Sequence, residues 1–564
     1  MKLHIHKCNS INVNKDEICD QLELDDIDYN NESLEVMNQT EKQNCSQNKR
    51  IKVIDPVENI AQSSVSSSIS SSLSTSSEIA NSKLDSFIRK TTKMESKNID
   101  LQIAKFIYST NSSFQHVEHK EFKKMINLLR PGYKPPTCHE IANELLNEVY
   151  LSVRQNIEKD LKGKIVSMVM AGWSNLHVEP IICISVTDIS EGNIHLIDTI
   201  HTAENRHTAD YLLHLAVTAI KSCQKFGCFV KSFVTDNASN MTKMRKQLSQ
   251  REDLAMPDII TYGCSVHILN LLGKDIDVPG LKDDIKEIIK YFKYTHFPAA
   301  KYKQAGGTSL NLPIDVRWNT LSDCFESYLK NWHILVKVCT ENRISIDTEI
   351  YAKVQNIDLK NKVEKYLFKL QKISSALDKA QNETCTIAEV TEIWIDLLQS
   401  VEKENFTIFE IDCFKTRFNM AMTSFHYLAN LLDHRYRGQK LSQSQAEEAL
   451  EYAAAYHPEA MPFIILYQAQ SSPFRKYLFL TQNMNNVHPV SWWCALRNSI
   501  NDAMFDLSMQ LHTAVASSAG IERLFPTFGL VHSKIRNRLG TEKASKLVSI
   551  MTTLNSNSII LNDD

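Results

Sequence analysis

The chain has 564 residues, of which 43% are hydrophobic and 23% carry a charged side chain. A chain of this length and composition buries a large core, and we expect two or more domains. Its formal net charge of -3 excludes a uniformly basic surface, so contact with nucleic acid must come from local basic patches.

No apolar run approaches the roughly 20 residues of a membrane-spanning helix, and residues 1–10 lack the apolar stretch of a signal peptide. We therefore expect neither secretion nor membrane insertion. The 13 cysteines are irregularly spaced, which favours free thiols over a disulfide framework. These observations favour the cytosol or the nucleus.

Residues 1–83 are expected to be a disordered tail. They include an acidic, polar stretch from Asp16 to Glu35 and a serine-rich run from Ser63 to Ser77. Such compositions bury too little apolar surface to offset the entropy of ordering the chain.

Residues 84–160 are expected to form a small helical segment, because apolar residues recur there at helical spacing. The predicted helices are 100–110, 121–130 and 138–164, the second of which ends before Pro131 and Gly132.

Beyond residue 160 the pattern changes to short runs rich in β-branched residues. In chain order the predicted elements are strands at 164–175, 179–189 and 193–202, a helix at 208–227, a strand from 228, a helix at 242–252, and a strand leading into a helix over 258–272. Strand, strand, strand, helix, strand, helix, strand is the order of a ribonuclease H-like fold.

The rest of the chain is predicted to be mostly amphipathic helix. We therefore expect an α/β protein with a ribonuclease H-like core that is interrupted by a large all-α insertion. The core would comprise residues 161–273 and 491–564, and the insertion residues 274–490.

Cutting a phosphodiester bond in such a fold requires three carboxylates from separate elements, which hold two divalent metal ions. Asp236 lies at the end of the predicted strand VKSFVTDN, where a carboxylate projects from the edge of the sheet. It is the best single candidate for such a ligand. The alternative is an aspartate that only shapes the turn with Asn237.

Several motifs, in this order along the chain, resemble those of hAT (hobo/Ac/Tam3) transposases. TDNASNM, around Asp236, is similar to the family's second catalytic Asp motif. GCSVHILN, with Cys264 and His267, is similar to its C-x-x-H motif, and DVRWNT, with Arg317 and Trp318, to its R-W motif. The combination is more specific than any one of its members.

The C-terminal sequence SSAGIERLFPTFGLVHSKIRNRL resembles the family's dimerisation and third-acid segment, which places the third acid at Glu522. The apolar periodicity of KLVSIMTTL supplies a face for self-association into a homodimer or higher oligomer. Pro526 stands where the family usually has Ser, and we expect it to shorten the helix.

The chain departs from the family at the first acid. Relatives carry Asp-x-Trp-[Ser/Thr] on the first strand, whereas this chain has Ala171 in place of the aspartate, followed by Gly172, Trp173 and Ser174. Active relatives use Mg²⁺ or Mn²⁺. With one of three ligands gone, Asp236 and Glu522 would hold such an ion weakly or not at all, and we expect little or no cleavage. Asp188, at the end of the second strand, is an alternative ligand, but a neighbouring strand displaces it by about 5 Å.

The resemblance implies DNA contacts at Trp173, Cys264, His267, Arg317, Trp318, Arg523, Lys534, Arg536 and Arg538. Trp318 would stack on a displaced base, and its alternative role is that of a core aromatic. The basic residues from Arg523 to Arg538 would meet phosphates or form a solvated helix face.

Zinc is not expected. Cys264 and His267 have the spacing of half a zinc site, but no second pair follows them. The N-terminal MKLHIHKC, with His4, His6 and Cys8, looks like the last turn of a BED-type zinc finger. Its Cys-x-x-Cys half is absent, so no tetrahedral site can form.

The sequence thus predicts a transposon-derived nuclear protein that dimerises and binds DNA but has lost its cleavage activity. One alternative is a working transposase that cuts DNA with divalent metal. Another is a protein-interaction scaffold that binds no DNA. Metal-dependent nicking would identify the former, and the absence of salt-dependent DNA binding the latter.

Overall fold

The computed structural model describes residues 91–174, 180–202, 205–251, 259–313, 319–531 and 539–560. The expected disordered tail, with its zinc-finger-like segment, lies outside these residues. The chain divides into two compact units, whose described parts are residues 158–529 in the larger unit and 91–157 with 530–560 in the smaller. Within the described ranges, none of the helices has the length and hydropathy that crossing a bilayer requires.

The smaller unit is helical. Its elements are α4 (Lys93–Ser109), η2 (Phe114–Glu118), α5 (Lys120–Leu129), α6 (Cys138–Ala142), most of α7 (Glu144–Leu161) and α26 (Thr541–Ile560). Helix α26 packs against α4, and its apolar side chains Leu547, Val548 and Ile550 are buried. The face of KLVSIMTTL that the sequence offered for self-association is therefore covered within the chain, and residues after Leu530 belong with the N-terminal helices.

The helix predicted over 138–164 is broken at Asn143, which lies between α6 and α7. The amide Nδ2 of Asn143 donates a hydrogen bond to the carbonyl of His139 at 2.8 Å, and its Oδ1 accepts one from Lys543 at 2.7 Å. Because Lys543 lies on α26, hundreds of residues away in sequence, local periodicity could not predict this break.

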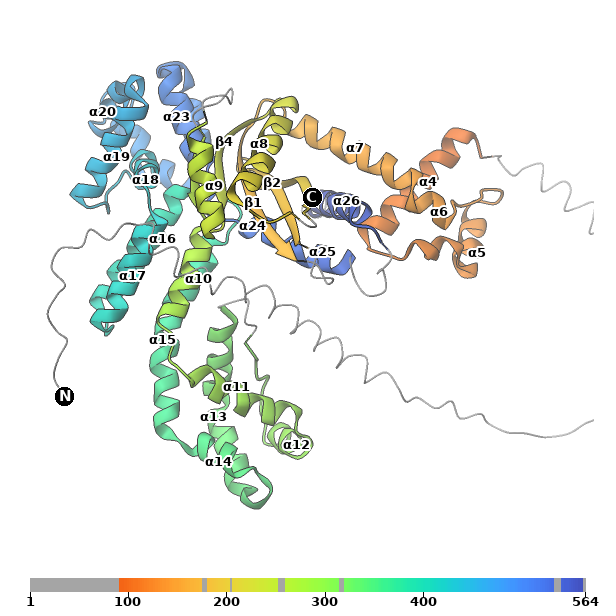
Figure 1. The fold of residues 1–564 in the computed structure, drawn as a ribbon, viewed down its shortest axis with the longest axis vertical. Coiled ribbons are helices and arrows are strands. Elements are labelled where there is room, and N and C mark those ends of the chain that lie inside the picture. The colour runs from red at the N-terminus through yellow and green to blue at the C-terminus, as the bar shows by residue number, and fades with distance from the viewer. Residues whose placement is uncertain are drawn as a thin grey trace, which may run out of the picture. The chain divides into compact units, whose positions relative to one another are not determined.

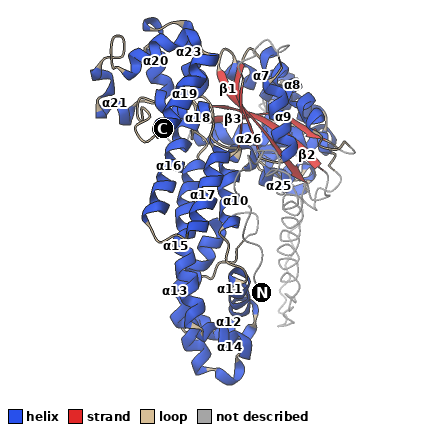
Figure 2. Ribbon diagram, turned by 60° about the vertical axis from the view of Figure 1, so that its left-hand side comes forward, coloured by secondary structure: helices blue, strands red, loops and turns tan. Residues whose placement is uncertain are grey.

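The larger unit contains one five-stranded mixed sheet (Figures 1 and 2). Its strands are β1 (Ile165–Ser174), β2 (Pro180–Asp188), β3 (Asn193–His201), β4 (Phe229–Thr235) and β5 (Ile260–Gly263), in the spatial order β3-β2-β1-β4-β5. The pairs β1–β2 and β2–β3 are antiparallel, whereas β1–β4 and β4–β5 are parallel. Helices α8 (Ala209–Lys225) and α9 (Ser239–Ser249) connect β3 to β4 and β4 to β5. This is the predicted order of elements.

Both faces of the sheet are covered. Successive residues from Val166 to Ala171 in β1 are all buried, although their side chains alternate between the two faces. Helix α8 contacts β3 and β4, and α9 contacts β5. The C-terminal helices α23 (Asp502–His512) and α24 (Ala519–Glu522) also contact the sheet, so the end of the larger unit's chain segment completes its core.

Between β5 and α23 the described chain is helical. The helices are α10 (Ser265–Asp275), α11 (Leu281–Tyr294), α12 (His296–Gln304), α13 (Asn319–Glu341), η3 (Arg343–Ser345), α14 (Thr348–Gln355), α15 (Ile357–Ala380), α16 (Ile387–Lys403), α17 (Ile408–Ala421), α18 (Ser424–Leu432), α19 (Gln443–Tyr456), η4 (Pro458–Ala460), α20 (Met461–Gln468), η5 (Lys476–Phe479), α21 (Thr481–Asn486), α22 (Pro489–Ala495) and η6 (Arg497–Ser499). The long α15 packs against α10, α13 and α16 (Figure 1). An ion pair of Arg417 with Asp275 (2.6 Å), in which the guanidinium is buried, joins α17 to α10.

The chain returns from the helices to the sheet through residues 513–518. The backbone N–H of Ala516 donates to the carbonyl of Cys385 at 2.8 Å, and the carbonyl of Ala516 accepts from the N–H of Ser265 at 3.2 Å. The hydroxyl of Tyr262, on β5, donates to the carbonyl of Val515 at 2.7 Å. The return segment is thus held between the start of α16 and the end of β5, and it leads directly into Glu522.

Candidate functional site

Ala171 and Asp236 meet at one edge of the sheet. The parallel register pairs Met170 of β1 with Thr235 of β4. Ala171 follows Met170 and Asp236 follows Thr235, so these two residues are also neighbours. Asp236 is half-buried, and its Oδ1 accepts a hydrogen bond from the backbone N–H of Ala238 at 3.0 Å. The carboxylate therefore shapes the turn after β4, as the alternative interpretation of the sequence held, and by register Asp236 is the residue next to Ala171.

A buried arginine holds the end of β4. The guanidinium of Arg245, on α9, donates to the hydroxyl of Thr235 and to the backbone carbonyl of Asp236. Only 8% of Arg245 is exposed, so it acts on the strand end rather than on a ligand in solution. From the sequence, Arg245 is predicted only to lie in a helix.

Asn237 joins the ends of β4 and β5. Its Nδ2 donates to the carbonyl of Cys264 at 3.0 Å. A Cβ atom on Gly263 would lie 1.6 Å from Oδ1 of Asn237, so the close approach requires glycine at this position. The two strand ends are thereby fixed relative to each other.

Cys264 is a structural residue. Its thiol is fully buried and accepts hydrogen bonds from the backbone N–H groups of His267, at 3.4 Å, and Ser518, at 3.3 Å. Burial, reinforced by the negative charge of Glu522, raises the pKa of the thiol to about 11. The three-residue spacing from Cys264 to His267 is explained by capping of α10. The side chain of Cys264 is buried, so the predicted DNA contact of Cys264 is corrected to a role within the protein.

His267 remains at the candidate site. It lies in the first turn of α10, and its ring atom Nε2 is buried without a hydrogen-bond partner among the described atoms. A buried ring nitrogen of this kind is available to a ligand or to water.

Glu522 is brought to the same region by the return segment. Ser518, whose backbone N–H donates to the thiol of Cys264, also donates through its hydroxyl to Oε1 of Glu522 at 2.6 Å. Helix α24 ends at Glu522, and α25 begins at Phe525 (Phe525–Val531), so Pro526 is the second residue of a new helix, as expected of a proline that interrupts helical pairing. Glu522 is thus linked through Ser518 to Cys264, the residue that follows β5.

Trp173 has a packing role within the chain. Its ring stacks on Phe525, with centroids 5.9 Å apart and planes inclined by 14°, and also contacts Phe528 at 5.6 Å. The rings bind the start of α25 to β1. Trp173 is half-buried, and its contact with DNA stays a prediction.

Arg523 is likewise engaged within the chain. Its guanidinium donates to the carboxylate of Glu383 and to the carbonyl of Gln381, at the turn between α15 and α16. The remaining predicted DNA contacts lie outside the described residues: Arg317, Trp318, Lys534, Arg536 and Arg538.

His207 is a candidate that sequence reasoning missed. Its Nε2 lies 2.7 Å from the hydroxyl of Thr202, which donates to the carbonyl of Pro180 at 3.0 Å and so accepts from the histidine. Burial lowers the pKa of His207 below its ordinary value, and the negative charge of Asp236 acts in the opposite direction. A histidine just before the N-cap of α8 gives no distinctive signal in sequence.

Asp188 cannot replace the missing acid. Because β2 runs antiparallel to β1, the neighbouring Thr187 pairs with Ser167, which places Asp188 at the other end of the sheet from Ala171. There it forms a 2.6 Å ion pair with Lys164. We expected Asp188 to lie one strand spacing from the position of the first acid. It lies instead roughly five residues along the strand direction from Ala171, or about 16 Å.

Within the described ranges, no three side chains of His, Cys, Asp or Glu are grouped as metal ligands. The weak or absent binding of Mg²⁺ or Mn²⁺ that Ala171 led us to expect stays a prediction, because two carboxylates without a third lack the bridging geometry that positions a pair of divalent ions.

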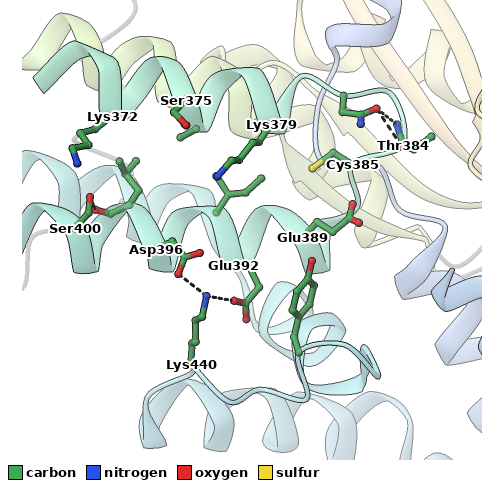
Figure 3. A pocket seen from close by; sticks show the side chains of 15 residues that line it. Lys372, Ser375, Lys379, Thr384, Cys385, Glu389, Glu392, Asp396, Ser400 and Lys440 are labelled. Carbon is green, nitrogen blue, oxygen red and sulfur yellow. Dashed lines mark hydrogen bonds and ion pairs between the residues drawn. The ribbon is translucent and has the colours of Figure 1, made fainter. Parts of the chain in front are cut away.

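A cavity lies elsewhere, between α15, α16 and Lys440 (Figure 3). It has a volume of about 520 Å³. Three lysines and three carboxylates line it: Lys372, Lys379, Lys440, Glu389, Glu392 and Asp396. Lys440 pairs with both Glu392 (2.8 Å) and Asp396 (2.5 Å), so the cavity neutralises its own charge and offers no excess charge to a nucleic acid.

Comparison with known proteins leaves the family open. No family model and no curated protein matches the sequence. Among solved structures, the Drosophila P element transposase strand transfer complex is similar, with a TM-score of 0.31 and 11% sequence identity, over 85% of this chain and 98% of that chain. A likeness of this degree does not assign a function, so the site's own residues must carry the interpretation.

Proposed function

We propose that this chain is a transposon-derived relative of hAT transposases that binds DNA but does not cut it. The observation that carries the proposal is the register of β1 with β4, which sets Ala171, rather than the acid that the resemblance leads us to expect, next to Asp236. The sheet order β3-β2-β1-β4-β5, with its first three strands antiparallel, supports a ribonuclease H-like core. In such a core the carboxylates that bind metal extend from these strand ends.

The two acids that remain are engaged within the chain. Asp236 and Glu522, which the resemblance assigns as the second and third acids, each accept a local hydrogen bond. His207 lies close enough to Asp236 for that negative charge to act on its pKa, and His267 lies in the first turn of α10. Nuclear localisation and self-association belong to the same proposal, with a self-association surface other than the buried face of α26.

The test combines a nicking assay with equilibrium DNA binding by the purified full-length chain. We expect no metal-dependent nicking of duplex DNA with Mg²⁺ or Mn²⁺. We also expect binding that weakens steeply with salt, because neutralised phosphates release counterions. Asp236→Ala serves as the matched variant, and it should bind DNA as the wild type does.

Two outcomes would overturn the proposal. Robust nicking that Asp236→Ala abolishes would identify a working transposase. Absence of DNA binding even at low salt would leave the protein-interaction scaffold as the better account. Light scattering on the purified chain tests self-association separately.

A further inference from the structure

A strongly basic segment lies on the helical part of the larger unit. From Ile288 to Ile314 the sequence has four lysines, Lys290, Lys293, Lys301 and Lys303, and no aspartate or glutamate. The segment covers the second half of α11 and the whole of α12. In a chain whose net charge is -3, this is a marked local excess of positive charge.

Two acids that precede the segment, Asp284 and Glu287, are engaged by a lysine outside it. Lys353, on α14, forms ion pairs with Asp284 at 3.0 Å and Glu349 at 3.2 Å, and with Glu287. By contrast, the described part of the chain supplies no ion pair to any of the four lysines. Their charge is therefore directed to solvent or to a partner.

Two exposed aromatic rings lie among these lysines. Tyr294 is 54% exposed and Phe297 41% exposed. The ammonium of Lys293 lies 6.0 Å from the ring centroid of Tyr294, and that of Lys301 lies 5.8 Å from the ring centroid of Phe297. Each ring thus has a cation beside it, and we call these six residues, Lys290, Lys293, Tyr294, Phe297, Lys301 and Lys303, the basic-aromatic face.

The backbone beneath this face is well supported. The hydroxyl of Tyr302, whose ring is buried, donates to the carbonyl of Thr308 at 2.6 Å. Thr308 in turn donates through its N–H and hydroxyl to Oδ1 of Asn331, on α13, both at 3.0 Å. Lys293 donates to the carbonyl of Leu310 at 3.1 Å, which draws the loop after α12 against α11. The face is therefore pre-organised, which reduces the entropy lost when a ligand binds.

We propose that the basic-aromatic face binds single-stranded DNA, with the lysines on phosphates and Tyr294 and Phe297 stacked on unpaired bases. The proposal rests on the proposed function, since it assigns a surface to DNA binding that lies apart from the strand-end site. Single strands fit better than duplex, because the faces of paired bases are hidden inside the double helix. The positive charge of the lysines favours a polyanion such as DNA, and the exposed aromatic rings favour its single-stranded form.

The test compares two matched double variants of the full-length chain. Lys290→Gln/Lys303→Gln removes two lysines of the face, and Lys362→Gln/Lys365→Gln removes two exposed lysines of α15. Binding of labelled oligothymidylate is followed by fluorescence anisotropy over a range of salt concentrations. Each lost phosphate contact should lower the salt slope by about 0.7, so the first variant should lose about 1.4 and the second nothing.

A third variant tests the rings. Tyr294→Ala/Phe297→Ala should weaken binding of the single strand about tenfold or more, leave the salt slope unchanged and change duplex binding little. Circular dichroism confirms that each variant is folded.

The outcomes separate this proposal from the previous one. Three results would overturn the proposed role of the basic-aromatic face and leave the proposed function standing. These are equal losses of salt slope in the two lysine variants, duplex binding by the wild type without single-strand binding, and preference for an RNA oligomer or anionic vesicles. Failure of the wild type to bind any DNA at low salt would overturn both.

Discussion

Ala171 and Asp236 are neighbours across the parallel β1–β4 pairing, one residue beyond the pair formed by Met170 and Thr235. Adjacent strands lie about 4.8 Å apart, so a carboxylate at position 171 would stand within the span that one divalent ion bridges. Under the proposed function, the methyl group of Ala171 stands where a metal ligand would extend, and the pairing of β1 with both its neighbours is kept.

Restoring the acid should restore metal binding. Ala171 is only 4% exposed, so Ala171→Asp should lower stability by a few kcal/mol without metal, because a carboxylate is then buried next to Asp236. Mn²⁺ or Mg²⁺ should recover that loss by binding the folded state. Thermal unfolding with and without metal measures both effects.

Ala171→Asn is the matched control, since it has nearly the same size without the charge. It should be insensitive to metal. Equal responses of the two variants to Mn²⁺, or a wild type that is itself stabilised, would show that position 171 is not a ligand position.

Trp173 should act on stability rather than on DNA. Its ring stacks on Phe525 and Phe528, so Trp173→Ala should cost about 2 to 3 kcal/mol in urea unfolding and expose the region around α25 to proteolysis. Trp173→Phe should keep most of the stacking. A Trp173→Ala variant with unchanged unfolding and weakened DNA binding would instead support the base contact that the sequence predicted.

Much of the fold could be predicted because its signals are local. The β-branched runs of β1, β2 and β3 and the apolar periodicity of α8 lie within single elements, and the structure has them where they were expected. The break at Asn143 and the pairing of α26 with α4 were missed, since both depend on contacts between residues distant in sequence.

The candidate site likewise has features that the sequence predicts and features that depend on distant contacts. The approach of Ala171 to Asp236 follows from strand register, which element order makes predictable. The true roles of Cys264, Trp173 and Arg523 depend on Ser518, Phe525 and Glu383, which no motif relates to them. His207 and Arg245 act through the tertiary fold and carry no pattern of their own.

Gly263 should be intolerant of any side chain. A Cβ there would lie 1.6 Å from Oδ1 of Asn237, which must then move and give up its hydrogen bond to the carbonyl of Cys264. Gly263→Ala should therefore cost about 1 to 3 kcal/mol in chemical unfolding. In an Asn237→Ala background the same change should cost little, and an undiminished cost in that double-mutant cycle would refute the proposed contact.

Two buried histidines should make the protein sensitive to acid. Burial lowers the pKa of His426 to about 3, and burial, opposed by the negative charge of Asp433, lowers that of His512 to about 4. Both rings are fully buried, and His512 stacks on Trp493 with centroids 6.3 Å apart. The folded chain therefore keeps these rings neutral at a pH where the unfolded chain protonates them.

The unfolded state binds more protons between the folded pKa values and about 6.5, so stability rises with pH in that window. This contribution to the free energy of unfolding is complete above about pH 6.5 and is lost as the pH falls towards 4. The loss is about 2 kcal/mol per histidine at about pH 5. Urea unfolding across this range should have a smaller pH slope in His512→Leu and in His426→Leu. His214→Gln, at an exposed position of α8, should keep the wild-type slope, and the same slope in all four proteins would exclude the buried histidines as its origin.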